Sequence, residues 1–198
     1  MKSATKQPEI AVVLDRDGTI NEERGYLCEP NNMVLLPTAC EAIHLLNTLN
    51  IPVIIVTNQS AIGRGLMTIE EFKAINSVLR QALHECDAYY DALYYCPHIP
   101  DPVSPCVCRK PQPGLLLQAA TDLKLNLSRS YIVGDKLTDL EAGYAVGCYG
   151  VLVRTGFGKT SCQALENSPK QPEYIADTLL EAVQWIKEKI KYHNHNKI

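Results

Sequence analysis

The chain has 198 residues, of which 46% are hydrophobic and 21% are charged, and its formal net charge at pH 7 is −3. These values fit one globular domain and exclude both a disordered chain and a membrane-embedded one. The longest apolar runs, such as residues 10–14, are far too short to cross a bilayer. The small negative charge argues against nucleic acid as a partner but leaves the binding of small anions open.

Strand-like and helix-like patterns alternate along the chain. Short apolar runs rich in β-branched residues, typical of strands buried on both faces, cover residues 10–14, 52–57, 88–95, 131–133 and 149–153. Helical patterns cover residues 38–49, 68–86, 113–123 and 137–146, and an amphipathic stretch follows at 174–190. Thr68 and Glu71 have the spacing of a capping box. This alternation predicts an α/β fold with a doubly wound parallel sheet, in one domain over residues 1–198 that ends in a polar, frayed tail at 191–198.

The chain contains eight cysteines, and the N-terminus shows no apolar segment typical of a secretory signal. We therefore expect a cytoplasmic protein whose cysteines stay reduced or bind metal. Five of them lack a metal-binding spacing and are expected to be small buried side chains: Cys28, Cys40, Cys86, Cys148 and Cys162.

Asp15-Arg16-Asp17-Gly18-Thr19 directly follows the first expected strand. Ligands of doubly wound sheets gather at the carboxyl ends of the strands. Two carboxylates at this spacing repel unless a cation or a shared proton relieves them, and Mg²⁺ is the natural cation for oxygen ligands. Taken alone, the pattern is more typical of a turn at the end of a strand.

Three further groups lie at the same edge of the expected sheet. Thr57 ends the second strand, where its hydroxyl can bond a phosphoryl oxygen. Arg109 and Lys110 precede a helix, and Asp135 and Asp139 follow the fourth strand one helical turn apart, a spacing that suits a divalent cation. Each group alone also fits a simpler role: a strand-end cap, a solvated basic pair or a helix cap.

The four groups together, in this order, resemble the haloacid dehalogenase (HAD) superfamily of phosphohydrolases over about residues 10–155. The resemblance implies a Rossmann-like fold, Asp15 as nucleophile and Asp17 as general acid and then base. It makes Thr57 and Lys110 the phosphate holders. Mg²⁺ would be held by Asp15, Asp17 and Asp135. The reaction would pass through an aspartyl phosphate, and the acid role of Asp17 requires a pKa raised by burial and by the neighbouring carboxylate.

A second metal site is predicted in the loop 96–108. Cys96, His98, Cys106 and Cys108 place three thiolates and one imidazole within 13 positions, a ligand set typical of tetrahedral zinc. Six of the 12 prolines fall between residues 97 and 113, so the loop has little secondary structure of its own and needs a metal to fix its shape. Four protein ligands leave no open position for water, and the zinc is therefore expected to be structural.

The zinc loop and the segment Cys108-Arg109-Lys110-Pro111 that follows it resemble the heptose 1,7-bisphosphate phosphatases and the related histidinol-phosphate phosphatases. The chain has no room for a large cap domain, so the loops 21–28, 58–65 and 99–110 are expected to form the substrate rim. The expected substrate-binding residues are Thr19, Asn21, Glu23, Tyr26, Asn58, Gln59, Arg64 and Arg109.

The resemblance implies a magnesium-dependent phosphatase, which we expect to contain the zinc described above and to be a monomer. Its substrate would be a small phosphorylated sugar, D-glycero-D-manno-heptose 1,7-bisphosphate, from which it would remove the 7-phosphate to supply heptose for lipopolysaccharide or other cell-surface polysaccharide. Arg64 and Arg109 would hold the second phosphate. Histidinol phosphate is the alternative substrate, since Glu22, Glu23 and Tyr26 suit a cationic molecule. A catalytically inactive, zinc-stabilised binding module is the more remote alternative, disfavoured because the whole catalytic set is present.

Overall fold

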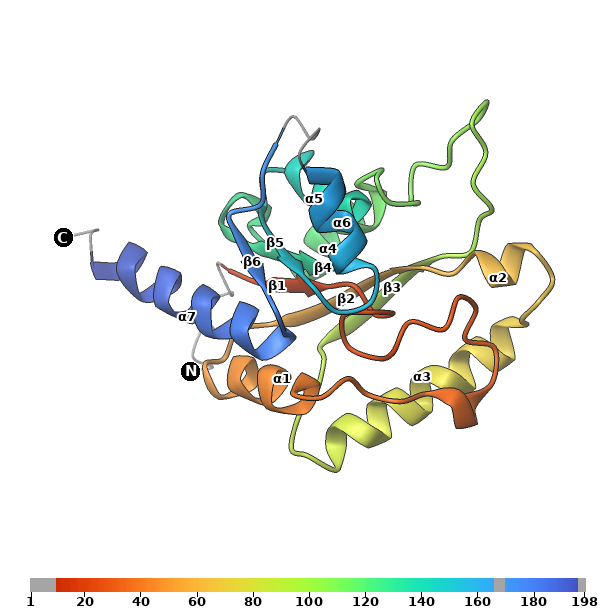
Figure 1. The fold of residues 1–198 in the computed structure, drawn as a ribbon, viewed down its shortest axis with the longest axis horizontal. Helices are drawn as coiled ribbons and strands as arrows, with labels where there is room; N and C mark the ends of the chain where they lie inside the picture. The colour runs from red at the N-terminus through yellow and green to blue at the C-terminus, as the bar shows by residue number, and fades with distance from the viewer. Residues whose placement is uncertain (1–9, 166–169, 196–198) are drawn as a thin grey trace, which may run out of the picture.

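A computed structural model describes residues 10–165 and 170–195, with side chains described to residue 192 (Figure 1). The strands are β1 Val12–Leu14, β2 Val53–Asn58, β3 Ala92–Cys96, β4 Tyr131–Gly134, β5 Tyr149–Val153 and β6 Tyr174–Ala176. They form one parallel sheet in the order β3-β2-β1-β4-β5-β6. The predicted doubly wound parallel sheet is thereby confirmed.

The helices are α1 Ala39–Thr48, α2 Ser60–Gly63, α3 Ile69–His84, α4 Gly114–Leu123, α5 Leu137–Tyr144, α6 Gly158–Ala164 and α7 Leu179–His195, with 3₁₀ turns at Pro30–Asn32 and Leu127–Arg129. The capping box that starts α3 is confirmed. Thr68 Oγ1 accepts a hydrogen bond from the Glu71 amide at 3.1 Å, and Glu71 Oε2 accepts one from the Thr68 amide at 2.7 Å. The short helices α2 and α6 were not expected from the sequence.

Three expected elements are corrected. The strand expected from residue 88 begins only at Ala92, because the amide of Ala88 still donates to Leu83 O at the end of α3. The amphipathic stretch from residue 174 starts as edge strand β6, and α7 begins only after Thr178, whose hydroxyl accepts from the Glu181 amide at 3.2 Å. The tail expected to be frayed is helical through residue 195, while 196–198 lie outside the described residues.

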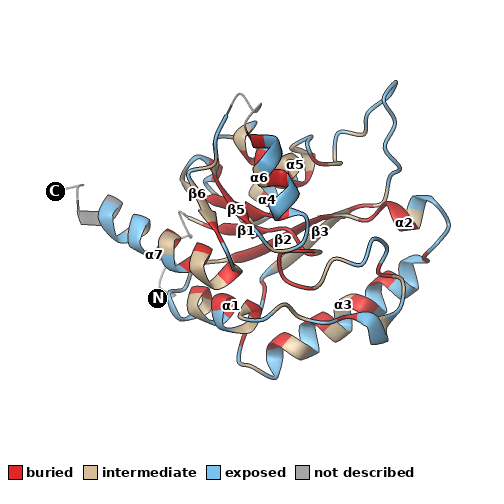
Figure 2. Cartoon of the chain, viewed as in Figure 1, coloured by how far each residue is buried: buried red, intermediate tan, exposed pale blue. Residues whose placement is uncertain are grey.

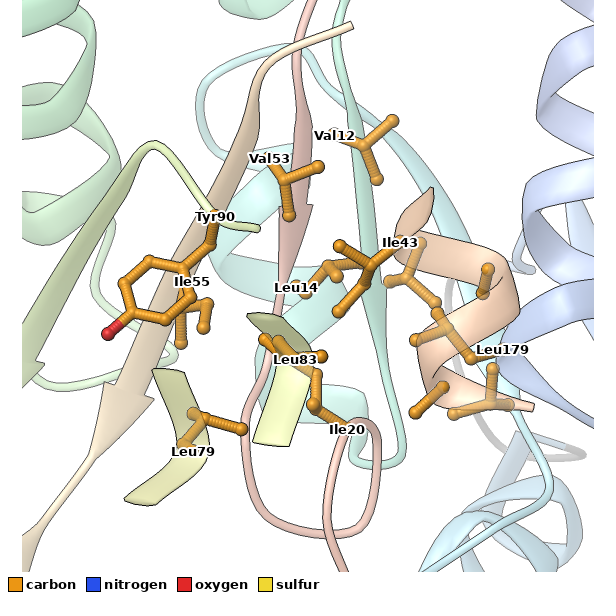
Figure 3. Packing of buried hydrophobic residues seen from close by; sticks show 14 of the residues in the cluster. Val12, Leu14, Ile20, Ile43, Val53, Ile55, Leu79, Leu83, Tyr90 and Leu179 are labelled. Carbon is orange, nitrogen blue, oxygen red and sulfur yellow. The ribbon is translucent and has the colours of Figure 1, made fainter. Parts of the chain in front are cut away.

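Alternate residues of the strands enter two separate cores. Val12 and Leu14 of β1 face the layer of α1, α3 and α7, and Val13 faces the layer of α4 and α5 (Figures 1 and 3). Successive side chains of a strand point to opposite faces, and here both faces are covered. The central strands are therefore buried along their whole length except for Asn58 at the end of β2, which is half-buried (Figure 2). This explains why they read as continuous apolar runs in the sequence.

The expectation that all non-metal cysteines are reduced is wrong for one pair. Cys40 on α1 and Cys86 just after α3 form a disulfide with an S–S distance of 2.06 Å. The two residues are 46 positions apart, and only the packing of α1 beside the end of α3 brings them together. Cys28, Cys148 and Cys162 are free thiols, of which only Cys148 is fully buried.

The sheet order fixes where a ligand can bind. From β1 the chain continues to β2 on one side of the sheet, and later returns to β4 on the other side of β1. The crevice at such a switch point, outside the carboxyl ends of the strands, is the binding site of doubly wound folds. The described segments at this edge are loops and the short α2, without an inserted cap domain. Across the described parts of the chain, no helix has the length and apolar character needed to traverse a membrane.

Candidate active site

A cavity of about 260 Å³ opens at the carboxyl ends of β1 and β2. Nine of its lining residues had been predicted as site residues: Asp15, Asp17, Glu23, Tyr26, Thr57, Asn58, Gln59, Arg109 and Lys110. Lys136 and Thr138 also line it and were assigned no role from the sequence, whereas Asp139 was considered only for its spacing from Asp135. The structure thus brings together side chains that are far apart in the chain, such as Asp15 and Lys110 at 95 positions and Glu23 and Lys136 at 113.

Lys110 is a buried residue that lines the cavity. Its Nζ donates to Asp15 Oδ1 at 2.7 Å and to the carbonyl of Val56 at 2.6 Å, and it pairs with Asp139 Oδ1 at 2.7 Å. Burial favours the neutral amine, but the two carboxylates outweigh it and hold the pKa of Lys110 above its usual value. Asn58 fixes the backbone of Lys110 from both sides, through bonds of 3.1 Å to its amide and to its carbonyl.

Asp15, Asp135 and Asp139 form a buried acidic cluster, with ligand atoms within 4.8 Å of one another. Burial raises the pKa of Asp15 to about 6, a rise that Lys110 opposes and Asp139 adds to. Burial and the two other carboxylates raise the pKa of Asp135 to about 8. Asp135 Oδ2 accepts from the Phe157 amide at 2.8 Å, but Oδ1 is buried without a partner among the described residues. This donor set fits a hard cation such as Mg²⁺.

Two glycines leave the space that Asp135 occupies. Gly18 has φ +82°, and a Cβ built there would lie 2.2 Å from Asp135 Oδ2. A Cβ on Gly156 would meet the same oxygen at 2.2 Å. Both turns therefore need glycine, one at the end of the Asp15–Asp17 segment and one in the loop after β5.

Asp17 differs from what the sequence predicted. Its Oδ1 accepts from Asn21 Nδ2 at 2.9 Å, its Oδ2 accepts from Gln59 Nε2 at 2.8 Å, and the guanidinium of Arg16 bonds both oxygens. Burial raises the pKa of Asp17, but Arg16 and these hydrogen bonds outweigh burial and lower the pKa overall. The expectation of a raised pKa is therefore wrong for this arrangement. The Asp17 carboxylate also lies outside the acidic cluster that groups Asp139 with Asp15 and Asp135.

The expected substrate rim is only partly assembled. Glu23 and Tyr26 line the cavity, and Glu23 Oε2 pairs with Lys136 Nζ at 2.9 Å. Arg109 also lines it, and its Nη1 donates to the His98 carbonyl at 3.2 Å. Arg64, at the end of α2, is exposed and does not line the cavity.

Two other expected substrate residues are buried outside the cavity lining. Thr19 and Asn21 are 0% exposed and do not line the cavity. The side chain of Asn21 instead holds Asp17, because the turn from residue 16 to 21 folds its amide back under the loop. Gln59 lines the cavity, but its side-chain amide donates hydrogen bonds to Asp17 Oδ2 at 2.8 Å and to Thr57 Oγ1 at 2.9 Å. Asn21 and Gln59 therefore hold Asp17, and Thr19 and Asn21 do not form part of the rim.

Sequence reasoning missed two further cations in this region. Arg16 lies inside the catalytic segment but was assigned no role. A basic residue between two carboxylates is itself a sign that it pairs with one of them. Lys136 directly follows Asp135, and its Nζ lies 4.5 Å from the centre of the Phe157 ring, at the cavity wall. Neither its pairing with Glu23 nor its stacking on Phe157 is visible in a linear sequence.

The four predicted zinc ligands come together beside the cavity. The pairwise distances between the sulfur atoms of Cys96, Cys106 and Cys108 and Nδ1 of His98 run from 2.8 to 3.9 Å. A tetrahedral zinc ion with bonds of about 2.0–2.3 Å has ligand–ligand edges of about 3.3–3.8 Å, which this range brackets. The cluster anchors the loop 97–105 at both ends, immediately before Arg109 and Lys110.

The parallel sheet, the paired carboxylates after β1, the buried lysine and the acidic turn after β4 define a phosphohydrolase of the HAD class. A family model described as HAD-hydrolase-like matches residues 107–182. The 7-phosphatase of D-glycero-D-manno-heptose-1,7-bisphosphate from Thermosynechococcus vestitus is 38% identical over 188 residues, covering 90% of this chain and 96% of its own. The corresponding β-heptose enzyme of Escherichia coli K12 is 37% identical over 187 residues, covering 91% and 95%.

A solved structure leads to the same family. The D,D-heptose 1,7-bisphosphate phosphatase of B. bronchiseptica, complexed with magnesium and phosphate, superposes with a TM-score of 0.83 at 31% identity and covers 91% of this chain and 99% of its own. The chain therefore belongs to the family of D-glycero-D-manno-heptose-1,7-bisphosphate 7-phosphatases.

Proposed function

We propose that the protein is a magnesium-dependent phosphatase that removes the 7-phosphate of D-glycero-D-manno-heptose 1,7-bisphosphate. The observation that carries the proposal is the buried group of Asp15, Lys110 and Asp139 that lines the cavity. It is supported by the alignment with a heptose phosphatase over 90% of this chain and 96% of that relative. The names of these relatives favour the heptose bisphosphate over histidinol phosphate. The intact catalytic set argues against an inactive binding module.

In the first step, a carboxylate oxygen of Asp15 attacks the phosphorus of the 7-phosphate. The bond between phosphorus and the sugar oxygen breaks, and Asp17 gives a proton to that oxygen. The arriving phosphate places negative charge beside Asp17, which raises its pKa from the lowered resting value and lets it take up the proton that it donates. Thr57 and Lys110 hold the phosphoryl oxygens.

In the second step, Asp17 takes a proton from a water molecule whose oxygen attacks the phosphorus of the aspartyl phosphate. The bond between phosphorus and the Asp15 oxygen breaks, which restores the Asp15 carboxylate and releases inorganic phosphate. Because the transition state of phosphoryl transfer spreads charge over three oxygens, fixed positive groups such as Lys110 supply much of the rate enhancement.

We propose that Asp15 and Asp135 hold Mg²⁺, with Asp139 beside them. The orphaned Asp135 Oδ1 and the raised pKa values of two buried carboxylates support this choice, since a cation relieves both. When bound, the ion would neutralise charge on the cluster and on the phosphoryl group. Asp17 is the third predicted ligand. Its carboxylate is hydrogen-bonded to Arg16, Asn21 and Gln59, so it would bind the ion through its backbone carbonyl oxygen.

We propose a structural zinc ion at Cys96, His98, Cys106 and Cys108. Its role is to fix the loop that carries Arg109 and Lys110 to the cavity. Arg109 and Lys136 are the cations at the wall that suit the second phosphate of the substrate, whereas Arg64 would have to move to reach it. A phosphorylated sugar is then held at both ends.

The expected monomer and the cytoplasmic location stay predictions. The Cys40–Cys86 disulfide is unusual for a protein of the cytoplasm. Labelling of thiols immediately after cell lysis would show whether the pair is joined in the cell, because the disulfide protects both cysteines from the reagent.

The reaction is tested by ³¹P NMR of the purified enzyme with heptose 1,7-bisphosphate and Mg²⁺. We expect the 7-phosphate signal to disappear, inorganic phosphate to appear and the 1-phosphate signal to remain, with no reaction by Asp15→Asn. Equal phosphate release by wild type and Asp15→Asn would refute the mechanism. Loss of the 1-phosphate would refute the assignment of the reacting group.

A further inference from the structure

Arg16 is a buried cation that the mechanism above leaves without a part. It stands between the two carboxylates of the catalytic segment, and its side chain is 0% exposed. Taking a guanidinium out of water is costly unless a carboxylate and further hydrogen bonds compensate it. Among the described residues, its carboxylate partner is Asp17.

The guanidinium holds the Asp17 carboxylate at both oxygens. Nη2 donates to Oδ2 at 2.9 Å and to Oδ1 at 3.0 Å, and Nε donates to Oδ1 at 3.2 Å. A two-point contact of this kind fixes the plane of the carboxylate as well as its position. A single hydrogen bond would leave the carboxylate free to rotate.

Arg16 is itself fixed from two other directions. Its Nη1 donates to Asn76 Oδ1 at 3.3 Å, and its guanidinium carbon lies 5.7 Å from the centre of the Phe72 ring, both residues on α3. Its backbone carbonyl accepts from the amides of Ile20 at 2.8 Å and Asn21 at 3.1 Å, which closes the turn after Asp17. The side chain therefore links the rigid helix α3 to the catalytic turn.

We propose that Arg16 is a positioning residue that holds the Asp17 carboxylate in the orientation from which it reaches the leaving-group oxygen. The inference rests on the proposed function in one respect, the acid and base role of Asp17. Asn21 and Gln59 complete the hold with one bond each, but neither contacts both oxygens.

The role predicts a specific kinetic signature. A displaced Asp17 protonates the leaving group poorly, and this matters most when the leaving oxygen is strongly basic. Phenyl phosphate and p-nitrophenyl phosphate are similar in size, but phenolate is the more basic leaving group. Damage confined to Asp17 therefore slows phenyl phosphate more than p-nitrophenyl phosphate, whereas general damage to the fold slows both alike.

The test compares kcat/KM of wild type and Arg16→Lys for the two aryl phosphates, at saturating Mg²⁺. Lysine keeps the charge but cannot hold both carboxylate oxygens in one plane. We expect a loss of about 100-fold with phenyl phosphate, the usual cost of a misplaced catalytic group, and of less than about 10-fold with p-nitrophenyl phosphate. Asp17→Asn should show the same unequal pattern.

Two further measurements guard against misfolding. Arg16→Ala leaves a cavity of the right shape for guanidinium, which should restore at least part of its phenyl phosphate activity at concentrations that leave the fold intact, while ammonium should not. Arg80→Lys is the matched control, because Arg80 lies on the same helix and stacks on Tyr90 at 4.5 Å, away from Asp17. It should stay within twofold of wild type.

Equal losses with the two aryl phosphates would overturn the proposal, as would wild-type activity in Arg16→Lys or Arg16→Ala. Rescue of Arg16→Ala by ammonium as well as by guanidinium would also count against a two-point hold. The assay is independent of the sugar. If the enzyme cleaves aryl phosphates but not heptose bisphosphate, the proposed substrate is wrong while the role of Arg16 is still decided.

Discussion

Replacement of Lys110 by methionine tests how the site is stabilised. Lys110 is the cation that compensates Asp15 and Asp139, at 2.7 Å from each and with side chains 2–7% exposed. Removing one partner of a buried ion pair costs about 3–5 kcal/mol, because the remaining charge has no compensation. For a chain of this size, 1 kcal/mol corresponds to about 2–4 °C, so the melting temperature should fall by about 6–20 °C. The pKa of Asp15 is already about 6, so the cluster can take up a proton in the variant. This relieves part of the uncompensated charge and moves the expected fall in melting temperature toward about 6 °C.

The assay is thermal unfolding at pH 7.5, followed by circular dichroism, with and without Mg²⁺. A cation that binds the folded cluster stabilises the protein by mass action. Because the cluster is more negative without Lys110, added Mg²⁺ should raise the melting temperature of Lys110→Met by more than that of wild type. Lys136→Met is the control. Its pair with Glu23 is partly exposed, and such pairs contribute at most about 1 kcal/mol. A fall of less than 2 °C in Lys110→Met, or an equal fall in both variants, would refute this reasoning.

Three other changes probe separate parts of the structure. Gly18→Ala places a Cβ 2.2 Å from Asp135 Oδ2 at φ +82°. It should therefore abolish the rise in melting temperature with Mg²⁺ and lower kcat by about 100-fold. Normal stabilisation by Mg²⁺ would contradict the close approach. Cys106→Ser should lower the zinc content measured by atomic absorption from about one ion per chain to near zero, and equal zinc in both proteins would remove the predicted site. Cys40→Ser removes a disulfide between residues 46 positions apart. Chain entropy predicts a loss of up to about 4 kcal/mol in the free energy of unfolding, measured by urea denaturation. Unchanged stability would show that Cys40 and Cys86 are not joined.

Much of the fold and the core of the site could be predicted from local patterns. Continuous apolar runs bounded by turns identify the buried strands, because both faces of the sheet are covered. Polar groups directly after those runs converge, since parallel strands present their carboxyl ends at one edge. Asp15 and Thr57 were found in this way, whereas Lys110 was found because it precedes a helix and completes the resemblance to the HAD superfamily. The structure places all three around one cavity.

The features that were missed depend on packing between distant segments. The pairing of Lys110 with Asp139 and the disulfide between Cys40 and Cys86 join residues that no periodicity relates. The lowered pKa of Asp17 follows from the direction in which Arg16 folds, and the sequence does not state that direction. A strand at the edge of the sheet, such as β6, is also hard to recognise, because its half-buried pattern merges with the helix that follows.

The central claim, that this chain is a heptose bisphosphate phosphatase, is tested most directly by its specificity constants. We would measure kcat/KM with Mg²⁺ for both anomers of D-glycero-D-manno-heptose 1,7-bisphosphate and for histidinol phosphate. The account predicts that one heptose anomer is preferred by at least about 100-fold, since loss of the contacts to the second phosphate costs several kcal/mol. Equal constants for all three substrates, or a preference for histidinol phosphate, would contradict it.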